Sequence, residues 1–401
     1  MNGKIICIFL FLIGLSSCLE PYEVNIKDYK DLLVVDALIT DEVKNHRVHL
    51  SRSVPNLDET PQVEAGALVI IKDENHNEEV LTEVAPGVYE TDQKQFIAKV
   101  GGTYTLSIRT ANGQEYQSSP CNILPKSTLN KVYVKTSKKW NEDRTIENYG
   151  LTILVDGNSY ENGYMRWEYE EDWKFKVPYA PIIRYDYDAQ SWVRIIKPEN
   201  EICWKSSISN EVIIHSLANQ GNFEVKAKEI CFIPSGLTDK LSVRYSILIK
   251  QMSISKGEYE FWNKLKISLE DTDNIAGNQP FSIKGNIKNI NDSKEPVLGY
   301  FQTGSVSFQR LYIDRNEVVS LGLPMTPSNY GCLLNTFIAD GKDYDTPLEI
   351  YEDLVVSGKL HLHDVVNDES GMRVIGLMLT SATCSDCTYS GTLRKPDFWE
   401  D

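Results

Sequence analysis

Short runs of β-branched and aromatic residues, separated by turn residues, recur along most of this chain. Residues 103–109 show the pattern most clearly, because apolar and polar side chains alternate there without interruption. Asn112 and Gly113 follow as the residue pair that a tight hairpin favours. The pattern predicts a mainly β fold, in which residues 32–124 form an immunoglobulin-like β-sandwich. Its other strand-like runs are residues 32–40, 47–51, 67–71 and 87–91.

A cluster of Ser and Pro between residues 118 and 127 marks the end of that module. All seven Trp residues lie beyond the cluster, so residues 125–401 have a distinct, aromatic-rich composition. Strand-like runs continue there at residues 131–134, 151–155, 164–170, 182–187, 192–196, 223–232 and 241–254. We therefore expect a second, larger β-rich domain at the C-terminus.

Two segments of this larger domain predict short helices. Ser255 and Glu258 have the spacing of a capping box, which marks a helix start. Apolar residues then recur at three- and four-residue spacing, so the helix is expected to reach about residue 270 and to pack this stripe on a sheet. The stripe consists of Phe261, Trp262, Leu265 and Leu269. A second short helix is expected near residues 348–354.

The N-terminus carries an export signal. Residues 1–17 hold an apolar run too short to span a bilayer, for which about 20 residues are needed, and they predict a lipoprotein signal peptide. The run ends in Leu-Ser-Ser-Cys, which resembles a bacterial lipobox and makes Cys18 the expected lipidation site. An ordinary signal peptide with a cysteine nearby by chance is the alternative. Residues 18–31 are polar and predict a lipid anchor and tether that hold the mature protein to a membrane.

Acidic residues outnumber basic ones, with 57 Asp and Glu against 41 Lys and Arg and a formal net charge of −16. Nucleic acid is excluded as a partner on this basis, because phosphate backbones are held by clustered Lys and Arg, and the chain has no such cluster. The acidity favours a cationic or neutral ligand over an anionic one.

The local signatures of common catalytic sites are missing. The chain contains no G-x-S-x-G, no phosphate-binding G-x-x-x-x-G-K-[ST], no G-x-G-x-x-G and no H-E-x-x-H. We therefore expect a protein that is not an enzyme and uses no cofactor. Catalytic groups also assemble from distant positions, so a hydrolase with its site in the larger domain stays open as an alternative.

Six cysteines follow Cys18, and an even number in an exported chain predicts disulfides. We expect Cys203 to pair with Cys231, and the pair formed by Cys384 and Cys387 to be linked internally or to Cys332. The Cys-x-x-Cys spacing of that pair also fits a redox motif or half of a zinc site, although the surrounding residues predict no helix and no second such pair exists. The sixth cysteine is Cys121.

Aromatic residues in the first half of the larger domain form a candidate recognition surface, since rings stack on sugars and anchor protein partners. Packing in the core is the alternative for the same rings. The candidate residues are Trp167, Tyr169, Trp173, Tyr185 and Tyr187.

Two further patterns resemble metal sites only weakly. His361 and His363 precede Asp364 and lie on one side of a predicted strand, with His215 or a carboxylate as a candidate third ligand. Residues 73–78 have oxygen ligands at alternate positions but carry Glu where a calcium-binding loop needs Gly. We expect exposed histidines without a metal in the first case and a solvated hairpin loop in the second.

Several segments appear in an order that resembles a family of Bacteroidota outer-membrane lipoproteins, domain of unknown function 4249. They are residues 18–21, 33–39, 101–106, 255–266, 285–287, 297–301, 384–388 and 395–399, of which the last two are the most distinctive. The resemblance implies an exported lipoprotein that is often encoded beside a TonB-dependent outer-membrane transporter. It brings no catalytic residues with it.

Together these features predict a non-enzymatic outer-membrane lipoprotein that serves a TonB-dependent transporter as an accessory or ligand-capture partner. A surface adhesin or glycan-binding protein is the second hypothesis, and a hydrolase is the third.

Overall fold

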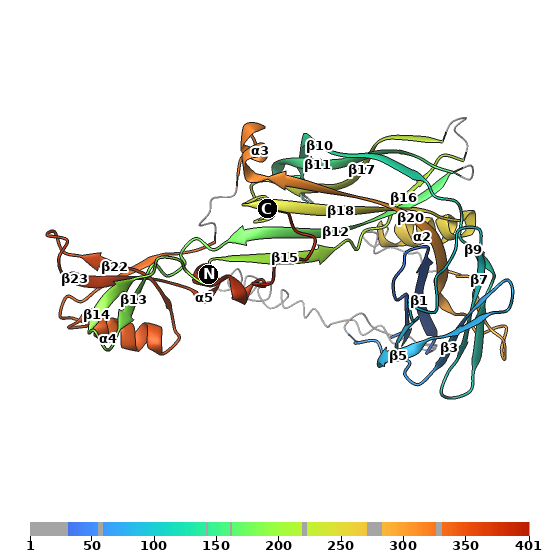
Figure 1. Cartoon of the computed structure of the whole chain (residues 1–401), viewed down its shortest axis with the longest axis horizontal. Coiled ribbons are helices and arrows are strands. Elements are labelled where there is room, and N and C mark those ends of the chain that lie inside the picture. The colour runs from blue at the N-terminus through green and yellow to red at the C-terminus, as the bar shows by residue number, and fades with distance from the viewer. Residues whose placement is uncertain are drawn as a thin grey trace, which may run out of the picture.

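The computed structural model describes residues 31–54, 59–141, 143–160, 163–218, 223–270, 283–325 and 331–400. The fold is mainly β, as predicted, with several antiparallel sheets and few short helices. Three parts follow one another along the long axis of the molecule, namely an N-terminal β-sandwich, a central body of two sheets and a small lobe (Figure 1).

Two packed sheets make the N-terminal sandwich. One sheet holds β1 (Leu33–Thr40), β2 (Arg47–Arg52), β6 (Val88–Glu90) and β5 (Thr82–Ala85). The other holds β19 (Ile287–Asn289), β8 (Glu115–Ser118), β7 (Thr103–Arg109), β3 (Leu68–Asp73) and β4 (Glu78–Val80), with β9 (Cys121–Asn122) beside β7. The predicted hairpin joins β7 to β8, and Gly113 in its turn adopts a φ of 86°, which favours glycine. Burial alternates along β7, so its predicted apolar face is confirmed as part of the core.

A single long strand, β20 (Leu298–Asp314), joins the sandwich to the central body. Its first half pairs in parallel with β1, and its second half pairs antiparallel with β18 (Arg244–Ser253). Phe301 on β20 and Ile287 on β19 are buried in the sandwich core. The sandwich therefore includes strands that a boundary at residue 125 assigns to the larger domain.

The central body is a second pair of sheets. β12 (Tyr164–Lys176), β18 and β20 lead to β15 (Ile202–Ile208), and β16 (Ile213–Ser216) also pairs with β12. A three-stranded sheet of β10 (Thr128–Trp140), β11 (Glu147–Asn158) and β17 (Glu224–Pro234) packs against them. Apolar residues from both sheets, such as Ile153 and Ile249, share one core.

The helix α2 (Lys256–Glu270) confirms the predicted start and extent. The Glu258 backbone N–H donates to Ser255 Oγ at 3.1 Å, which caps the first turn. Phe261 is buried with its ring 5.0 Å from that of Tyr300 on β20. Leu269 at the far end of the stripe is 58% exposed, so the predicted packing holds only for the first turns of the helix.

The Glu258 side chain points into the joint between α2 and the long sheet. Burial raises the pKa of Glu258 to about 8, although the nearby charge of Arg166 opposes the shift. Among the described residues, no hydrogen-bond partner reaches its Oε1 atom. The Arg166 guanidinium lies 4.0 Å from the ring centre of Trp262 and donates to Gln302. The joint therefore holds the buried carboxyl group of Glu258 near the Arg166 guanidinium, which already contacts Trp262 and Gln302.

The small lobe combines two separate stretches of the chain. The hairpin of β13 (Ile183–Asp186) and β14 (Ser191–Arg194) comes from the middle of the sequence. A three-stranded sheet of β21 (Asn335–Ile338), β22 (His361–Asn367) and β23 (Val374–Thr380) comes from the C-terminal part. The helix α4 (Pro347–Ile350) and the π-helical turn η2 (Tyr351–Val356) lie between β21 and β22 and confirm the second predicted helix.

The C-terminal segment returns from the lobe to the central body through α5 (Ala382–Ser385) and η3 (Cys387–Tyr389). Trp399 is buried there, with its ring 6.4 Å from that of Trp204 and 5.9 Å from that of Tyr312. Another short helix, α3 (Arg315–Ser320), directly follows β20.

Candidate functional site

A polar hollow of about 680 Å³ lies at the end of the N-terminal sandwich where β1 begins. Four stretches of chain meet there, namely the start of β1, the segment after β2, the β7–β8 turn and the loop that follows β19. Its lining residues are Asp31, Leu32, Arg52, Gln62, Val63, Glu64, Asn112, Gln114, Tyr116, Asp292, Lys294 and Glu295. The volume lies within the range of small-molecule sites, roughly 300–1,000 Å³.

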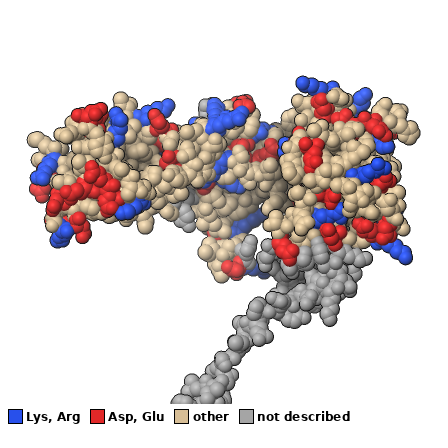
Figure 2. All heavy atoms as spheres, turned by 90° about the horizontal axis from the view of Figure 1, so that it is seen from below, with Lys and Arg blue, Asp and Glu red and all other residues tan. Residues whose placement is uncertain are grey.

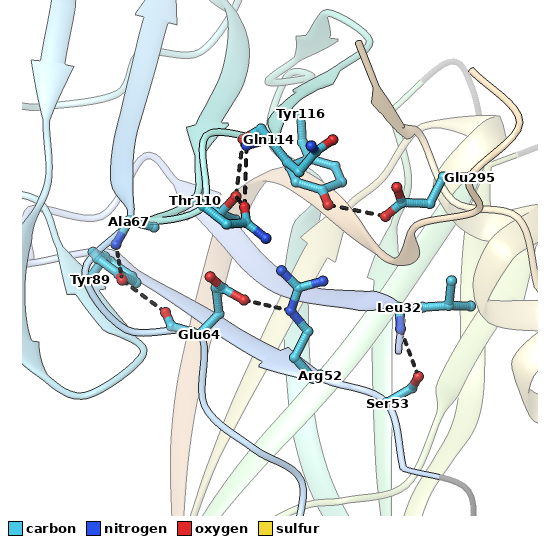
Figure 3. A network of polar contacts seen from close by, with 11 residues as sticks. Leu32, Arg52, Ser53, Glu64, Ala67, Tyr89, Thr110, Gln114, Tyr116 and Glu295 are labelled. Atoms are coloured by element: carbon cyan, nitrogen blue, oxygen red, sulfur yellow. Dashed lines mark hydrogen bonds and ion pairs between the residues drawn. The ribbon is translucent and has the colours of Figure 1, made fainter. Parts of the chain in front are cut away.

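One wall of the hollow is a fixed ion pair. Arg52 Nε donates to Glu64 Oε2 at 2.5 Å, and both side chains are only 13% exposed (Figure 3). The Tyr89 hydroxyl donates to the Glu64 carbonyl oxygen at 2.9 Å and accepts from Ala67 N–H at the same distance, which holds the chain beneath the pair. Burial lowers the pKa of Arg52, but the hydrogen bond and charge of Glu64 raise it more, so the guanidinium remains charged.

Another wall of the hollow centres on Tyr116 and Glu295. The Tyr116 hydroxyl donates to Glu295 Oε1 at 3.1 Å, and Asn289 Nδ2 donates to Glu295 Oε2 at 2.7 Å. Burial and the hydrogen bond to Glu295 raise the pKa of Tyr116. Asn289 Nδ2 also lies 3.3 Å from Gln114 Oε1, which ties the β7–β8 turn to the loop that follows β19. Both walls are thus positioned by contacts within the protein before any ligand binds.

The lining chemistry is a mixture of donors and acceptors. Gln62, Asn112 and Gln114 bring side-chain amides, while Asp31 and Asp292 bring carboxylates. Such a mixture suits a ligand that carries hydroxyl or amine groups, because each can donate and accept. Sequence reasoning missed this site, since the four stretches meet only after β19 joins the sandwich.

Three residues of the predicted recognition surface are buried instead. Trp167, Tyr169 and Trp173 share the face of β12 that packs in the central core, with exposed fractions of 0, 8 and 8%. Trp167 Nε1 donates to Gln251 Oε1 and Trp173 Nε1 to Asp239 Oδ1, each at 3.0 Å. For these rings the alternative of packing in the core is confirmed and a recognition surface is contradicted. The reason is that the three-stranded sheet covers β12, so the alternation marked an inner face.

Tyr185 and Tyr187 lie elsewhere, on and beside β13 in the small lobe. Their ring centres are 5.1 Å apart, and Tyr185 also contacts Trp192 of β14 at 5.0 Å. Trp192 in turn lies 5.5 Å from Tyr351 of η2. The structure therefore separates the five predicted residues into a core set and an aromatic cluster on the small lobe.

The predicted histidine pair lies on β22, but its rings have separate partners. The His361 ring lies 5.7 Å from that of Tyr389, whereas His363 Nδ1 lies 2.8 Å from the Ala180 carbonyl oxygen. His215 lies on β16 in the central body. Within the described parts of the chain, no three His, Cys, Asp or Glu residues are grouped to hold a metal ion. Residues 73–78 form the β3–β4 hairpin loop, in which the Asp73 carboxylate accepts from Asn75 and Asn77 backbone N–H groups.

Two disulfides form among the described residues, and the prediction for one pair was wrong. Cys203 on β15 bonds Cys387, not Cys231, which is free and buried on β17. Cys332 bonds Cys384, which was one of the two predicted alternatives. Cys203 lies at the outer edge of the long sheet next to the returning C-terminal segment, whereas Cys231 faces the core from the opposite sheet. Because the two C-terminal cysteines take different partners, neither a redox pair nor a zinc site is formed by them.

The lipidation site Cys18, the signal peptide and residues 18–30 of the tether lie outside the described residues. None of the described helices is long and apolar enough to cross a membrane.

The family described as Domain of unknown function (DUF4249) matches residues 19–310, and the chain belongs to this family. The match covers the sandwich, most of the central body and the β13–β14 hairpin. It ends before the rest of the small lobe and before residues 384–388 and 395–399, the segments on which the resemblance depended most. The comparison with curated proteins found no match.

Proposed function

We propose that this protein is a non-enzymatic lipoprotein of the outer membrane, anchored through Cys18, that serves a TonB-dependent transporter by capturing a polar ligand. The lipobox and the membership of the family support the location. The observation that carries the proposal is the preformed hollow at the start of the folded chain.

The position of the hollow suits capture close to a membrane. Asp31 lines it, and the 13 steps of chain from Cys18 to Asp31 span at most about 45 Å when fully extended. A ligand held there stays within reach of a transporter in the same membrane. The excess of carboxylates over cations in the lining favours a ligand without negative charge.

Affinity purification of the tagged protein from detergent-solubilised outer membranes tests the partner. We expect a barrel transporter to be recovered with it. A Cys18→Ala variant is the control, because it lacks the anchor and should leave the membrane fraction without a change in fold. Recovery of the wild-type protein alone, at full yield, would contradict the proposal.

A glycan-binding protein is the second candidate, and the lining of the same hollow favours it. Amide and carboxylate groups that are already held in place recognise sugar hydroxyls well. A panel of neutral oligosaccharides titrated by calorimetry should reveal binding that Gln114→Ala weakens by about tenfold, the value of one lost hydrogen bond. Gln117→Ala, at an exposed position on β8 outside the hollow, should leave it unchanged. If an oligosaccharide binds and Gln114→Ala does not weaken it, the hollow is not the glycan-binding site.

A further inference from the structure

The small lobe has a second, apolar hollow of about 270 Å³. It opens between the β13–β14 hairpin, η2 and the start of β22. Its apolar lining residues are Pro181, Ile183, Ile195, Tyr351, Val355, Leu360 and Leu362. Arg184 and His361 also line it, and the Arg184 guanidinium is paired with Asp186. A cavity of this size accepts one side chain of a partner rather than a whole ligand.

An aromatic cluster continues from the edge of this hollow. Tyr351 lines the hollow and also belongs to the cluster. Its ring contacts that of Trp192, which contacts Tyr185, which in turn contacts Tyr187. Tyr187 at the outer end is 57% exposed, and Val356 beside the hollow's lining is 61% exposed. Rings that are packed on one side and exposed on the other are typical anchors in protein interfaces.

The charge around these apolar groups is acidic. Residues 340–353, which run into η2, contain six Asp and Glu and a single Lys. Asp353 is paired with Lys359 and Asp340 with Lys342, but Asp343, Asp345 and Glu352 have no salt bridge among the described residues. Figure 2 shows acidic side chains gathered at the end of the molecule that carries the small lobe.

We propose that the small lobe docks a basic segment of a partner protein. An apolar side chain of that segment fills the hollow, and its Lys and Arg side chains lie over the exposed ring of Tyr187 and the carboxylates of residues 340–353. A second copy of this chain is a poor occupant, because each copy carries a formal net charge of −16. An anionic membrane surface is repelled for the same reason.

The inference goes beyond the proposed function, since the ligand hollow lies in the sandwich at the other end of the molecule (Figure 1). Loss of docking at the lobe would leave ligand binding in the sandwich unchanged, and the reverse also holds. The two proposals can therefore fail separately.

Fluorescence anisotropy with labelled peptides tests the inference on the full mature protein. The probe is a peptide that alternates Lys with Leu and Phe, and the comparison peptide carries Glu at every Lys position. We expect the Lys peptide to bind and its affinity to fall with added salt, because exposed ion pairs are screened over about 10 Å at 0.1 M salt. Absence of binding, or equal binding of both peptides, overturns the inference.

Variants then locate the site. Tyr187→Ala and Glu352→Lys should each weaken the Lys peptide by about fivefold, as expected for an interface ring and for a reversed charge. The matched controls are Phe308→Ala, a ring 66% exposed on β20, and Asp143→Lys, an exposed acid of the central body. Both controls should bind as the wild type does. Equal losses in the lobe variants and the controls would show unspecific attraction to an acidic protein and would overturn the assignment to the lobe.

Discussion

The N-terminal sandwich and the small lobe are built from similar short strands but are held together differently. In the sandwich, two sheets bury a large shared core, and its cysteine Cys121 is free. In the lobe, the buried apolar residues of the core that the structure describes are few, namely Ile350, Leu362, Val365, Leu377 and Leu379. A small unit of this kind seldom buries enough apolar surface to be stable alone.

Two disulfides, where the lobe joins the central body, supply the stabilisation that the small core of the lobe lacks. The bond between Cys332 and Cys384 closes the segment that contains the three-stranded sheet, and the bond between Cys203 and Cys387 ties the same segment to β15 of the central body. The sandwich is therefore positioned by its core and by β20, whereas the lobe is positioned by covalent links. A docking surface needs such fixed placement, since lost mobility on binding lowers affinity.

The largest effect is expected from a cavity in the sandwich core. Phe301→Ala should lower the free energy of unfolding by about 3–5 kcal/mol, because its ring is fully buried on the strand that both large bodies share. Urea unfolding followed by far-ultraviolet circular dichroism measures this loss of stability, and Trp fluorescence is recorded in parallel. All seven Trp lie outside the strands of the sandwich, so their signal shifts only if β20 couples the two bodies. Phe308→Ala on the same strand, with a ring 66% exposed, should change stability by no more than about 0.5 kcal/mol.

The next largest effect is a loss of stability that is expected in the lobe but not in the sandwich. The double variant Cys332→Ser, Cys384→Ser should destabilise the lobe by about 2–4 kcal/mol, since the disulfide closes a segment with a sequence separation of 52 residues. Hydrogen exchange should speed up in β21, β22 and β23 and stay unchanged in β1 and β7. Equal protection of the lobe in both proteins would show that its core suffices without this bond.

A pH-dependent effect is expected at the joint between the sandwich and the central body. The pKa of Glu258 is about 8 in the fold and 4.5 ordinarily, so the folded protein retains a proton that the unfolded chain releases. Its contribution to stability is therefore complete below about pH 4.5 and is lost as the pH rises through about 8. Glu258→Gln keeps the shape and removes the titration.

Melting temperatures of the wild type and of Glu258→Gln should diverge between pH 5 and pH 8 in favour of the variant. The gap in stability should grow by at most about 1.4 kcal/mol per pH unit, the value for one proton. Glu260→Gln, on the solvent side of the same helix, is the control and should follow the wild type. Parallel pH profiles for all three proteins would mean that Glu258 is not buried as described.

Patterns local in sequence predicted the elements well. Alternation located β7 and β12, and the spacing of Ser255 and Glu258 located the start of α2. Alternation could not tell which face of β12 meets solvent, because a buried face and a recognition face have the same period. For Trp167 and Trp173 the sequence therefore left a recognition surface and packing in the core both open, and the structure shows packing in the core.

Features that depend on contacts between distant segments could not be predicted from the sequence. The parallel pairing of β1 with β20 joins residues far apart in the sequence, and it completes the sandwich that contains the hollow. The partner of Cys203 is likewise set by the path of the C-terminal segment, whose return beside β15 no local pattern encodes. Nothing in the sequence around Glu295 or Gln114 indicates that the two residues line one hollow until the topology is known.

The smallest effect tests how independent the lobe is. Thr346 and Glu349 form a capping box at the start of α4, and Thr346→Ala should cost about 1 kcal/mol because Glu349 N–H loses its acceptor. If the lobe unfolds as a separate unit, exchange should quicken across the lobe, in β21, β22 and β23 as well as in α4, and the urea midpoint of the Trp signal from the central body should not move. A shift of that midpoint would instead make the lobe part of one cooperative unit with β15, linked through Cys203 and Cys387. In that case the disulfides transmit stability as well as position.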